Sequence, residues 1–513
     1  MPGCCEGSTV ESACMIRHSG LLLALLLALI LLWAPLPFGG IVPWAAALLA
    51  ALAFAALALA AVAAESPRAL RPAALPAAAL AGMALLGLLQ AAPLPAGLVA
   101  ALSPRHAALE RQAADLAAPA PARLTLAASS TRRTALGWAA AAAAFLAGAV
   151  VGRRRELRRW LAWAVLAGAL FQVLFGARDW FARASTLWGV DLHATATRLR
   201  GTFVNPNHLA VYLEMALPAA FAWSWWAARR ARDEPRVERR VVLAVPPVML
   251  WLTLFAGLAF TGSRAGLLAA AFAVSVQGVL AAEERRRWWL APLGAAVALT
   301  GIVTVAAIGW REGLGRLLAT SAADVSLGAR LREYGAALAL WRRFPVTGTG
   351  LGTFRDAFPL VQPADFQGTW WHPHSDPLEV LVTAGLVGAA LLAAGLWGLV
   401  VRLVTVLRDG GRSEDRATAM AALGVLASLA VHEGLDFGLS MPGNAITLAV
   451  LLGGAGTARV RERSAELGHA RQDLAAVEAL QLQHVEPAPE RRRHLQRRAR
   501  PDGELPQGRP VEP

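Results

Sequence analysis

The segment HPHSDPLEV (372–380) combines two histidines and two acids directly before a long apolar stretch. Asp376, Pro377 and Glu379 are typical of the N-cap, the first and the third position of a helix start. His374 lies just before this start, beside the positive end of the helix dipole, where anions bind. Its imidazole can accept a proton from a hydroxyl near neutral pH, so His374 is the candidate catalytic residue.

Arginine close to apolar stretches is the second feature that could do chemistry. Arg198 and Arg200 lie in TRLRGTFVNPNHLA, and Arg264 lies in TGSRAG, between two apolar runs with almost no loop to solvate it. A charge so close to a membrane is costly and usually has a partner or ligand. Because a guanidinium binds anionic oxygens in pairs, these arginines are candidate ligands of a diphosphate.

Other polar residues near these segments are candidate contacts to a sugar or an acceptor. Each could equally be an ordinary loop or first-turn residue, and Asn205 and Pro206 fit the cap and first turn of a helix. The candidate contacts are Asn207, His208, Arg330, Arg332 and His372.

Three further patterns are interpreted as structural or weak. The glycine-rich stretch TGTGLGTF lacks the Lys-Ser/Thr of a phosphate loop. His432 and Asp436, one helical turn apart in VHEGLDF, are interpreted as a structural pair. His372 and His374 with one carboxylate would form a crowded ligand set without an H-E-x-x-H spacing, so neither a metal nor another cofactor is expected.

Composition indicates which elements must position these residues. Of 513 residues, 56% are hydrophobic and 16% charged, and the apolar runs are each near the roughly 20 residues that cross a bilayer as a helix. The sequence therefore predicts an all-α, polytopic integral membrane protein with about 12 transmembrane helices. Their expected starts are near residues 20, 41, 72, 135, 157, 207, 241, 265, 288, 377, 417 and 442.

The distribution of arginine predicts the topology. All 49 basic residues are arginine, and most lie in loops between spans, which favours topology over nucleic-acid binding as the reason for the net charge of +14. The rule that positive loops are cytoplasmic places four arginine-rich loops and both termini inside. These loops are 153–159, 229–240, 283–287 and 402–416. The longer loops 93–134, 177–206 and 309–376 then lie outside, the last between the ninth and tenth spans.

Three regions follow from this reading. We expect an N-terminal cytoplasmic segment (1–19), a membrane domain (20–458) and a cytoplasmic, basic and largely disordered tail (459–513). The first apolar run is interpreted as an uncleaved helix. Translation from Met15 is a further hypothesis, which would remove all three cysteines, Cys4, Cys5 and Cys14.

Taken together, residues 135–455 resemble the O-antigen ligase and polymerase superfamily of bacterial envelope glycan enzymes. His374-Ser375, nine residues, then Gly385-Leu386-Val387-Gly388 is similar to the ligase-type signature of that superfamily. The segments RLRGTFVNPNHLA, TGSRAG, PVTGTGLGTF and HEGLDF with MPGNA resemble other family segments and occur in the same order.

The resemblance implies glycosyl transfer at the periplasmic face of the bacterial inner membrane. The implied donor is a glycan on undecaprenyl pyrophosphate, and the acceptor is a lipid A-core sugar, another lipid-linked glycan or a protein hydroxyl. Arg264 and either Arg198 or Arg200 would hold the diphosphate, and His374 would activate the acceptor hydroxyl. Stabilising the leaving pyrophosphate is where these arginines would contribute most.

Several alternatives remain open at this stage. The signature also occurs among the polymerases, so a polysaccharide polymerase or a protein O-oligosaccharyltransferase fits as well as a ligase. A transporter of a small anion would need polar groups at mid-membrane, where Glu214 is an exception among Ala, Leu, Val and Gly. A scaffold or flippase partner without activity would leave the arginines and His374 without a purpose.

Overall fold

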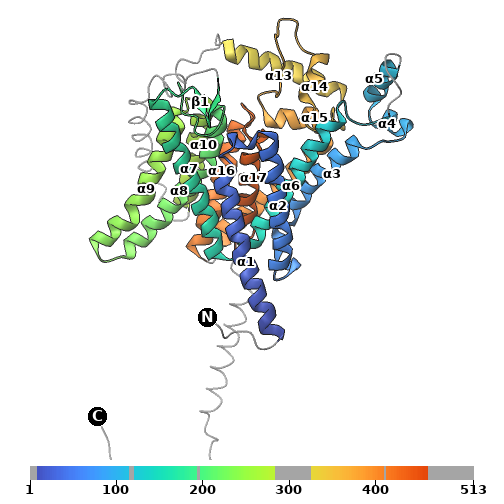
Figure 1. The fold of residues 1–513 in the computed structure, drawn as a ribbon. Coiled ribbons are helices and arrows are strands. Elements are labelled where there is room, and N and C mark those ends of the chain that lie inside the picture. Colours follow the sequence, from blue (N-terminus) through green and yellow to red (C-terminus); the bar gives the residue numbers. More distant parts are fainter. Residues whose placement is uncertain (1–7, 115–120, 193–196, 284–324, 410–411, 460–513) are drawn as a thin grey trace, which may run out of the picture. The chain divides into compact units, whose positions relative to one another are not determined.

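The computed structural model describes residues 8–114, 121–192, 197–283, 325–409 and 412–459 (Figure 1). Within these ranges the regular structure is almost entirely α-helical, as predicted, and one two-stranded antiparallel hairpin joins β1 (Thr186–Leu187) to β2 (Val190–Asp191). The α-helices are α1 (Ser8–Trp33), α2 (Pro43–Ala63), α3 (Ala74–Ala91), α4 (Ala96–Leu102), α5 (Pro104–Ala114), α6 (Ala128–Gly152), α7 (Arg155–Phe181), α8 (Pro206–Asp233), α9 (Val237–Phe260), α10 (Arg264–Glu283), α13 (Val325–Arg343), α14 (Phe354–Ala357), α15 (Asp376–Asp409), α16 (Ser413–His432) and α17 (Pro442–Gly456). Short 3₁₀ turns are η1 (Phe38–Gly40), η2 (Pro67–Ala73), η4 (Phe358–Leu360) and η5 (Gly438–Ser440).

Eight helical segments of the described chain are long and apolar enough to cross a membrane. They are α1, α2, η2 with α3, α6, α7, α9, α10 and α15. Helices α8, α16 and α17 pack among them, α8 against α9 and α16, and α17 against α6. Eleven of the twelve predicted spans thus each overlap a helix, and the predicted ninth span, near residue 288, lies outside the described residues. Part of the loop 309–376 and nearly all of the tail 459–513 also lie outside them.

Small residues allow the central helices to approach closely. A Cβ atom at Gly148 would lie 2.4 Å from the carbonyl oxygen of Val450, and one at Gly152 would lie 2.1 Å from that of Gly454. Helices α6 and α17 are therefore in backbone contact along a Gly-xxx-Gly face. Such contacts drive association inside a bilayer, where burial of apolar surface no longer distinguishes protein from lipid.

The arginine-rich junctions gather at one end of the helices. Arg155 and Arg158, at the start of α7, both donate to the buried carboxylate of Asp415 at the start of α16, each at 2.7 Å. Arg402 on α15 donates to the carbonyl oxygens of Gly456 and Ala458, at the end of α17. The predicted shared sidedness of these loops is consistent with this clustering.

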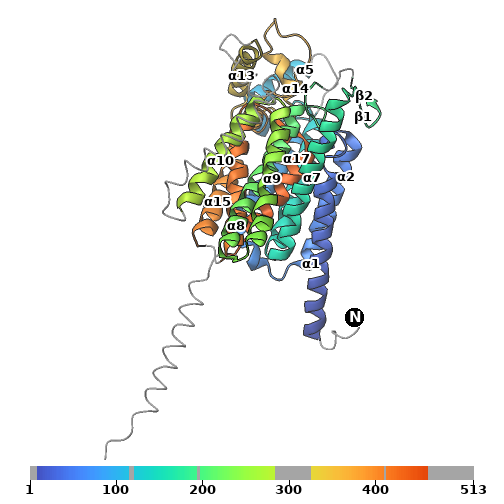
Figure 2. The same ribbon diagram turned by 90° about the vertical axis from the view of Figure 1, so that its left-hand side faces the viewer.

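The opposite end carries α13, α14 and the β1–β2 hairpin (Figures 1 and 2). Helices α1, α3, α7, α9 and α16 finish there, and α8, α10, α15 and α17 begin there. The predicted site residues lie at this end, in its loops, in the first residues of α8 and α10, or on α13. The described part of the predicted loop 309–376 includes helices α13 and α14.

Helix α15 is interrupted near this end, at Gly385. The residue has φ 63° and ψ −163°, a conformation that is essentially restricted to glycine. The backbone groups freed by the interruption bind the glycine-rich stretch: Leu386 N–H donates to the carbonyl of Pro345, and Gly350 N–H donates to that of Thr383. A Cβ at Gly385 would also lie 2.3 Å from the oxygen of Val346. The glycine motif that begins at Gly385 and the segment PVTGTGLGTF are therefore hydrogen-bonded to each other and form one structural unit.

Candidate functional site

His374 is held by a buried carboxylate from another part of the chain. Its Nδ1 lies 3.0 Å from Oε2 of Glu333 on α13, where the Glu333 side chain is fully buried and that of His374 is 31% exposed. The hydroxyl of Tyr334 donates to the carbonyl oxygen of His374 at 2.8 Å. Ring and backbone are thus both fixed, although His374 has a positive φ of 47°. The geometry directs Nδ1 toward the protein and leaves Nε2 on the other edge of the ring.

Burial dominates the electrostatics of this pair. Desolvation raises the pKa of the Glu333 carboxyl, while the hydrogen bond and charge of His374 oppose that rise. Burial also raises the pKa of the Tyr334 hydroxyl, so it remains a donor. A carboxylate that accepts from Nδ1 fixes the imidazole tautomer and stabilises the imidazolium form that appears when Nε2 takes a proton. The pair therefore has the carboxylate–imidazole geometry that a general base requires.

Phe437 brings three histidines together. Its ring centroid lies 5.1 Å from that of His208, 4.6 Å from that of His372 and 5.2 Å from that of His374. The His372 ring is stacked on Phe437, whereas the other two meet it edge-on. His208 itself is buried in the first turn of α8. Three of the predicted site residues thus surround one aromatic side chain.

His372 forms its own carboxylate pair. Its Nδ1 lies 2.8 Å from Oε2 of Glu379, in the first turn of α15. Burial opposes the charged imidazole, but the hydrogen bond and charge of Glu379 outweigh that effect, and the pKa of His372 is raised. The Nδ1 of His372 therefore faces Glu379, and this contact fixes the orientation of the ring.

A chain of polar contacts links two of the predicted arginines. Arg198 donates to the carbonyl of Thr261 at 2.5 Å and to Oδ1 of Asn207 at 2.7 Å. The Asn207 amide nitrogen donates to the buried Asp436 at 2.7 Å, and Asp436 lies 3.7 Å from Arg330. Arg330 and Glu333 are three residues apart on α13, which places them on one helical face. The arginine chain and the His374 pair therefore meet at α13.

The other predicted arginines have different surroundings. Arg200 is buried and donates to the carbonyl of Ala184 at 3.1 Å. Arg332 pairs with Asp365 and lies over the ring of Phe366. Arg264 is partly exposed and is the first residue of α10, directly after the turn whose Thr261 accepts from Arg198.

Two local interpretations of the sequence are wrong in detail. Asp376 does not cap α15 with its side chain, which instead accepts from Leu439 N–H and from the hydroxyl of Ser440. His432 is not paired with Asp436: its Nδ1 lies 2.5 Å from Glu214. The reason is tertiary, because α16 and α8 pack together and the loop after α16 folds onto the start of α15.

One local interpretation is confirmed. Asn205 is the N-cap of α8, its side chain accepts from Asn207 N–H at 2.9 Å, and Pro206 is the first helical residue.

The sequence analysis did not identify Glu333, Tyr334 or Phe437 as site residues. It also did not identify Asp436 as the hydrogen-bond partner of Asn207. The segment GARLREY offered one signal, since Arg330 and Glu333 share a helical face at this spacing. Nothing local predicts that His374, 41 residues further on, is the partner of Glu333. Within the described ranges, no group of three or more His, Cys, Asp or Glu residues is arranged to hold a metal ion.

The fold and site together define a multi-pass helical membrane protein with a carboxylate-bound histidine and several arginines gathered at one end. Residues 248–393, from α9 into α15, match the family described as O-Antigen ligase. The match includes Arg264, Arg330, Glu333 and His374 and excludes Arg198. No curated protein sequence matches the chain. This match supports the predicted relationship of the region to the O-antigen ligase and polymerase superfamily, whose glycan transfer serves surface polysaccharide biosynthesis.

Proposed function

We propose that this protein transfers a glycan from undecaprenyl pyrophosphate to an acceptor hydroxyl at the periplasmic face of the bacterial inner membrane. The Glu333–His374 pair, joined through α13 to the chain of Arg330, Asp436, Asn207 and Arg198, is the observation that carries the proposal. It combines a base with cations in one place, which glycosyl transfer from a diphosphate requires.

The proposed face follows from charge. The arginine-rich junctions around Asp415 lie at the end of the helices opposite His374. Positively charged loops remain on the cytoplasmic side, so the His374 end is the periplasmic end in this proposal. A lipid-linked donor can then present its diphosphate at the level of Arg198 and Arg264 while its chain stays in the bilayer.

The proposed reaction is a single displacement. Nε2 of His374 removes the proton from the acceptor hydroxyl as the oxygen attacks the anomeric carbon of the glycan. The bond from that carbon to the pyrophosphate oxygen breaks, and the electron pair leaves with the lipid pyrophosphate. Glu333 stabilises the imidazolium until the proton passes to solvent. The products are the glycosylated acceptor, the lipid pyrophosphate and one proton.

Arg198 suits the leaving group better than Arg200. The negative charge that develops on the pyrophosphate must be stabilised by a cation that the diphosphate can approach. Arg200 is buried and bound to Ala184, whereas Arg198 is only partly buried and belongs to the network that reaches Asp436. Arg264, one turn of chain beyond Thr261, is the second proposed ligand of the diphosphate.

Transfer in reconstituted vesicles tests the proposal. Wild type should transfer an oligosaccharide from its lipid pyrophosphate to one of three acceptors: a lipid A-core sugar, a second lipid-linked repeat or a protein. The acceptor consumed distinguishes ligase, polymerase and protein O-oligosaccharyltransferase. His374→Ala and Arg264→Ala, each with an unchanged melting temperature, should abolish transfer.

Two results would reject the proposal. One is full activity of His374→Ala. The other is a wild type that forms no product with any acceptor but moves a small anion across the vesicle membrane, which would establish the transporter instead.

A further inference from the structure

The loop after α16, residues 433–440, carries two groups of the candidate site. Asp436 belongs to the chain of polar contacts that reaches the arginines, and Phe437 contacts the three histidines. The loop is fastened to the start of α15, where Asp376 N–H lies 3.0 Å from the carbonyl oxygen of Glu433 and 3.2 Å from that of Asp436. Whatever holds this loop against α15 therefore also places Asp436 and Phe437.

Two carboxylates meet at this junction and share one donor. Leu439 N–H donates to Oδ2 of Asp376 at 2.9 Å and to Oε2 of Glu433 at 3.3 Å. The Ser440 hydroxyl donates to Oδ1 of Asp376 at 3.0 Å, and Gly438 N–H donates to Oε2 of Glu433 at 2.9 Å. The two acidic side chains also form a hydrogen bond with each other. Because these donors are N–H and O–H groups that point at the oxygens, the junction is not arranged to hold a metal cation.

A hydrogen bond between two carboxyl groups requires a proton on one of them, because an ionised carboxylate can only accept. Glu433 is the better place for that proton. Its side chain is buried, with the residue 4% exposed, and its Oε1 has no hydrogen-bond donor within the described ranges. A negative charge on that oxygen would be buried without compensation. Burial and, after it, the charge of Asp376 raise the pKa of Glu433 well above its usual range.

The charged groups around the two acids do not compensate a second negative charge. Three of these groups are themselves acids, and the two histidines among them direct Nδ1 at one of those acids. Like charges disfavour the ionisation of a neighbouring carboxyl group, so retaining one proton relieves the repulsion. The groups are His372 and Glu379 beside Asp376, Glu214 and His432 beside Glu433, and Asp436 in the same loop.

We propose that Glu433 is a positioning residue of the site, which keeps one proton, shares it with Asp376 and thereby holds the loop 433–440 against α15. Loss of this proton would bring two negative charges to one N–H group and would move Asp436 and Phe437 out of place. The role of Glu433 in transfer rests on the proposed function, whereas its proton can be measured without any substrate.

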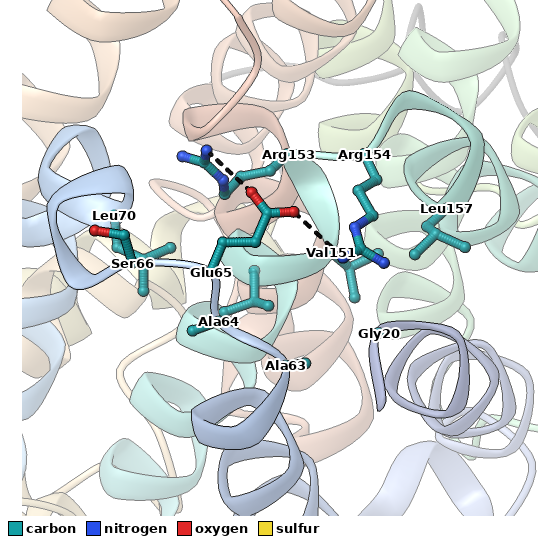
Figure 3. Close-up of a pocket in the computed structure, with 11 residues that line it drawn as sticks. Gly20, Ala63, Ala64, Glu65, Ser66, Leu70, Val151, Arg153, Arg154 and Leu157 are labelled. Carbon is teal, nitrogen blue, oxygen red and sulfur yellow. Dashed lines mark hydrogen bonds and ion pairs between the residues drawn. The ribbon is translucent and has the colours of Figure 1, made fainter. Parts of the chain in front are cut away.

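Infrared difference spectroscopy tests the proton directly. Wild type minus Glu433→Gln, in an ester-free detergent at about pH 7, should show the C=O band of a protonated carboxyl group, which shifts in D₂O. Glu65→Gln is the matched control, because Glu65 pairs with Arg153 and Arg154 at the opposite end of the helices (Figure 3). Its difference spectrum should show the bands of a carboxylate. Carboxylate bands from Glu433 as well would overturn the proposal.

Melting temperatures in detergent give a second test. A raised folded pKa means that Glu433 stabilises the fold fully below its unfolded pKa of about 4.5, and that this contribution is lost as pH rises through the folded pKa. Glu433→Gln has no such proton to lose. Its melting temperature should therefore rise relative to wild type between about pH 5 and about pH 9. A difference that stays constant over this range, or that changes in the opposite direction, would contradict the shared proton.

Transfer tests whether the proton positions the site. Glu433→Met removes the hydrogen bonds of this side chain and should lower transfer per folded molecule about tenfold, as loss of one such bond predicts. Glu433→Gln keeps a donor for Asp376 and an acceptor for Gly438 N–H, so it should recover most of that loss. It should also retain more transfer than wild type at about pH 9, where wild type loses the shared proton.

The possible failures are distinguishable. Equal losses of transfer in Glu433→Gln and Glu433→Met, with a protonated Glu433 in the infrared spectrum, would overturn the positioning role of the proton. A wild type that transfers to no acceptor would reject the proposed function instead, and the infrared bands and melting temperatures would still decide whether Glu433 holds the proton.

Discussion

Two carboxylate–histidine pairs of the same composition occupy different depths of this protein. Glu214 and His432 lie inside the helix bundle, 2.5 Å apart and both fully buried, and Ser428 donates to the second oxygen of Glu214. Glu333 and His374 lie 3.0 Å apart at the end of the bundle, with only the glutamate fully buried. The first pair satisfies both oxygens of a carboxylate that the bilayer would penalise, whereas the second leaves the imidazole partly exposed. The composition of the two pairs therefore does not distinguish the candidate base, whereas their exposure does.

The difference also bears on transport. A carrier needs polar groups at mid-membrane that exchange between a ligand and the protein. Glu214 instead uses both of its oxygens within the protein, on His432 and Ser428. This closed arrangement favours the enzyme over the transporter, although the sequence singled out Glu214 as the polar exception.

The largest expected effect is a difference between substitutions of His374 and His432, the first lowering transfer and the second lowering stability. His374→Gln should reduce transfer about 10³-fold, roughly 4 kcal/mol of barrier, because the base is lost, and should leave the melting temperature unchanged. His432→Gln should lower the free energy of unfolding by about 3 kcal/mol, because it leaves a buried carboxylate without its partner. Transfer per folded molecule and thermal unfolding in detergent measure the two effects. The comparison fails if His432→Gln loses transfer per folded molecule as severely as His374→Gln.

A smaller effect is expected at the paired arginines. Arg198→Gln should lower transfer about 10²-fold through loss of charge at the leaving pyrophosphate. Arg200→Gln is the matched control two residues away, and should reduce mainly the melting temperature, because it disturbs the buried contact with Ala184. Initial rates at saturating donor measure transfer by both variants, and thermal unfolding in detergent measures their melting temperatures. The reverse ranking would move the diphosphate site to Arg200.

Substitution of Glu333 should lower the rate of transfer less than substitution of His374, because Glu333 acts through the imidazole of His374. Glu333→Gln keeps the size of the side chain but removes its charge, and should lower kcat about tenfold with little change in KM for the acceptor. Glu333→Asp keeps the charge and should recover part of that loss. Equal loss in both variants would show that the fit of the side chain matters rather than its charge.

The smallest expected effect is a pH dependence at His372. Its folded pKa is raised above the value of about 6.5 in unfolded chains. Its charged pair with Glu379 therefore stabilises the fold fully below about pH 6.5, and this contribution is lost as pH rises through the folded pKa. The melting temperature of wild type should exceed that of His372→Gln at about pH 6, and the gap should narrow by about pH 9. A gap that widens with pH would contradict the pairing.

The sequence predicted the helices well and the contacts between them poorly. Apolar runs of membrane-spanning length and arginine-rich breaks are local signals, so each predicted span in the described ranges overlaps a helix. Capping is also local, and Asn205 caps α8 as predicted. Asp376 carries the same kind of signal, but its carboxylate binds the backbone of Leu439 and the hydroxyl of Ser440, 63 and 64 residues away. A capping preference is worth only about 1 kcal/mol, so a tertiary contact can replace it.

By itself, the sequence determined the all-α membrane fold, the common sidedness of the arginine-rich junctions and the candidate histidine His374. These depend on hydrophobicity, charge and motif spacing along the chain. Only the tertiary structure decided which carboxylate serves which histidine, Glu333 for His374 and Glu214 for His432. Each partner comes from a helix distant in sequence, and burial of its carboxylate depends on how α13, α15, α8 and α16 pack. Because that burial sets the proton affinity of a carboxyl, the chemistry of the site follows from packing rather than from residue order.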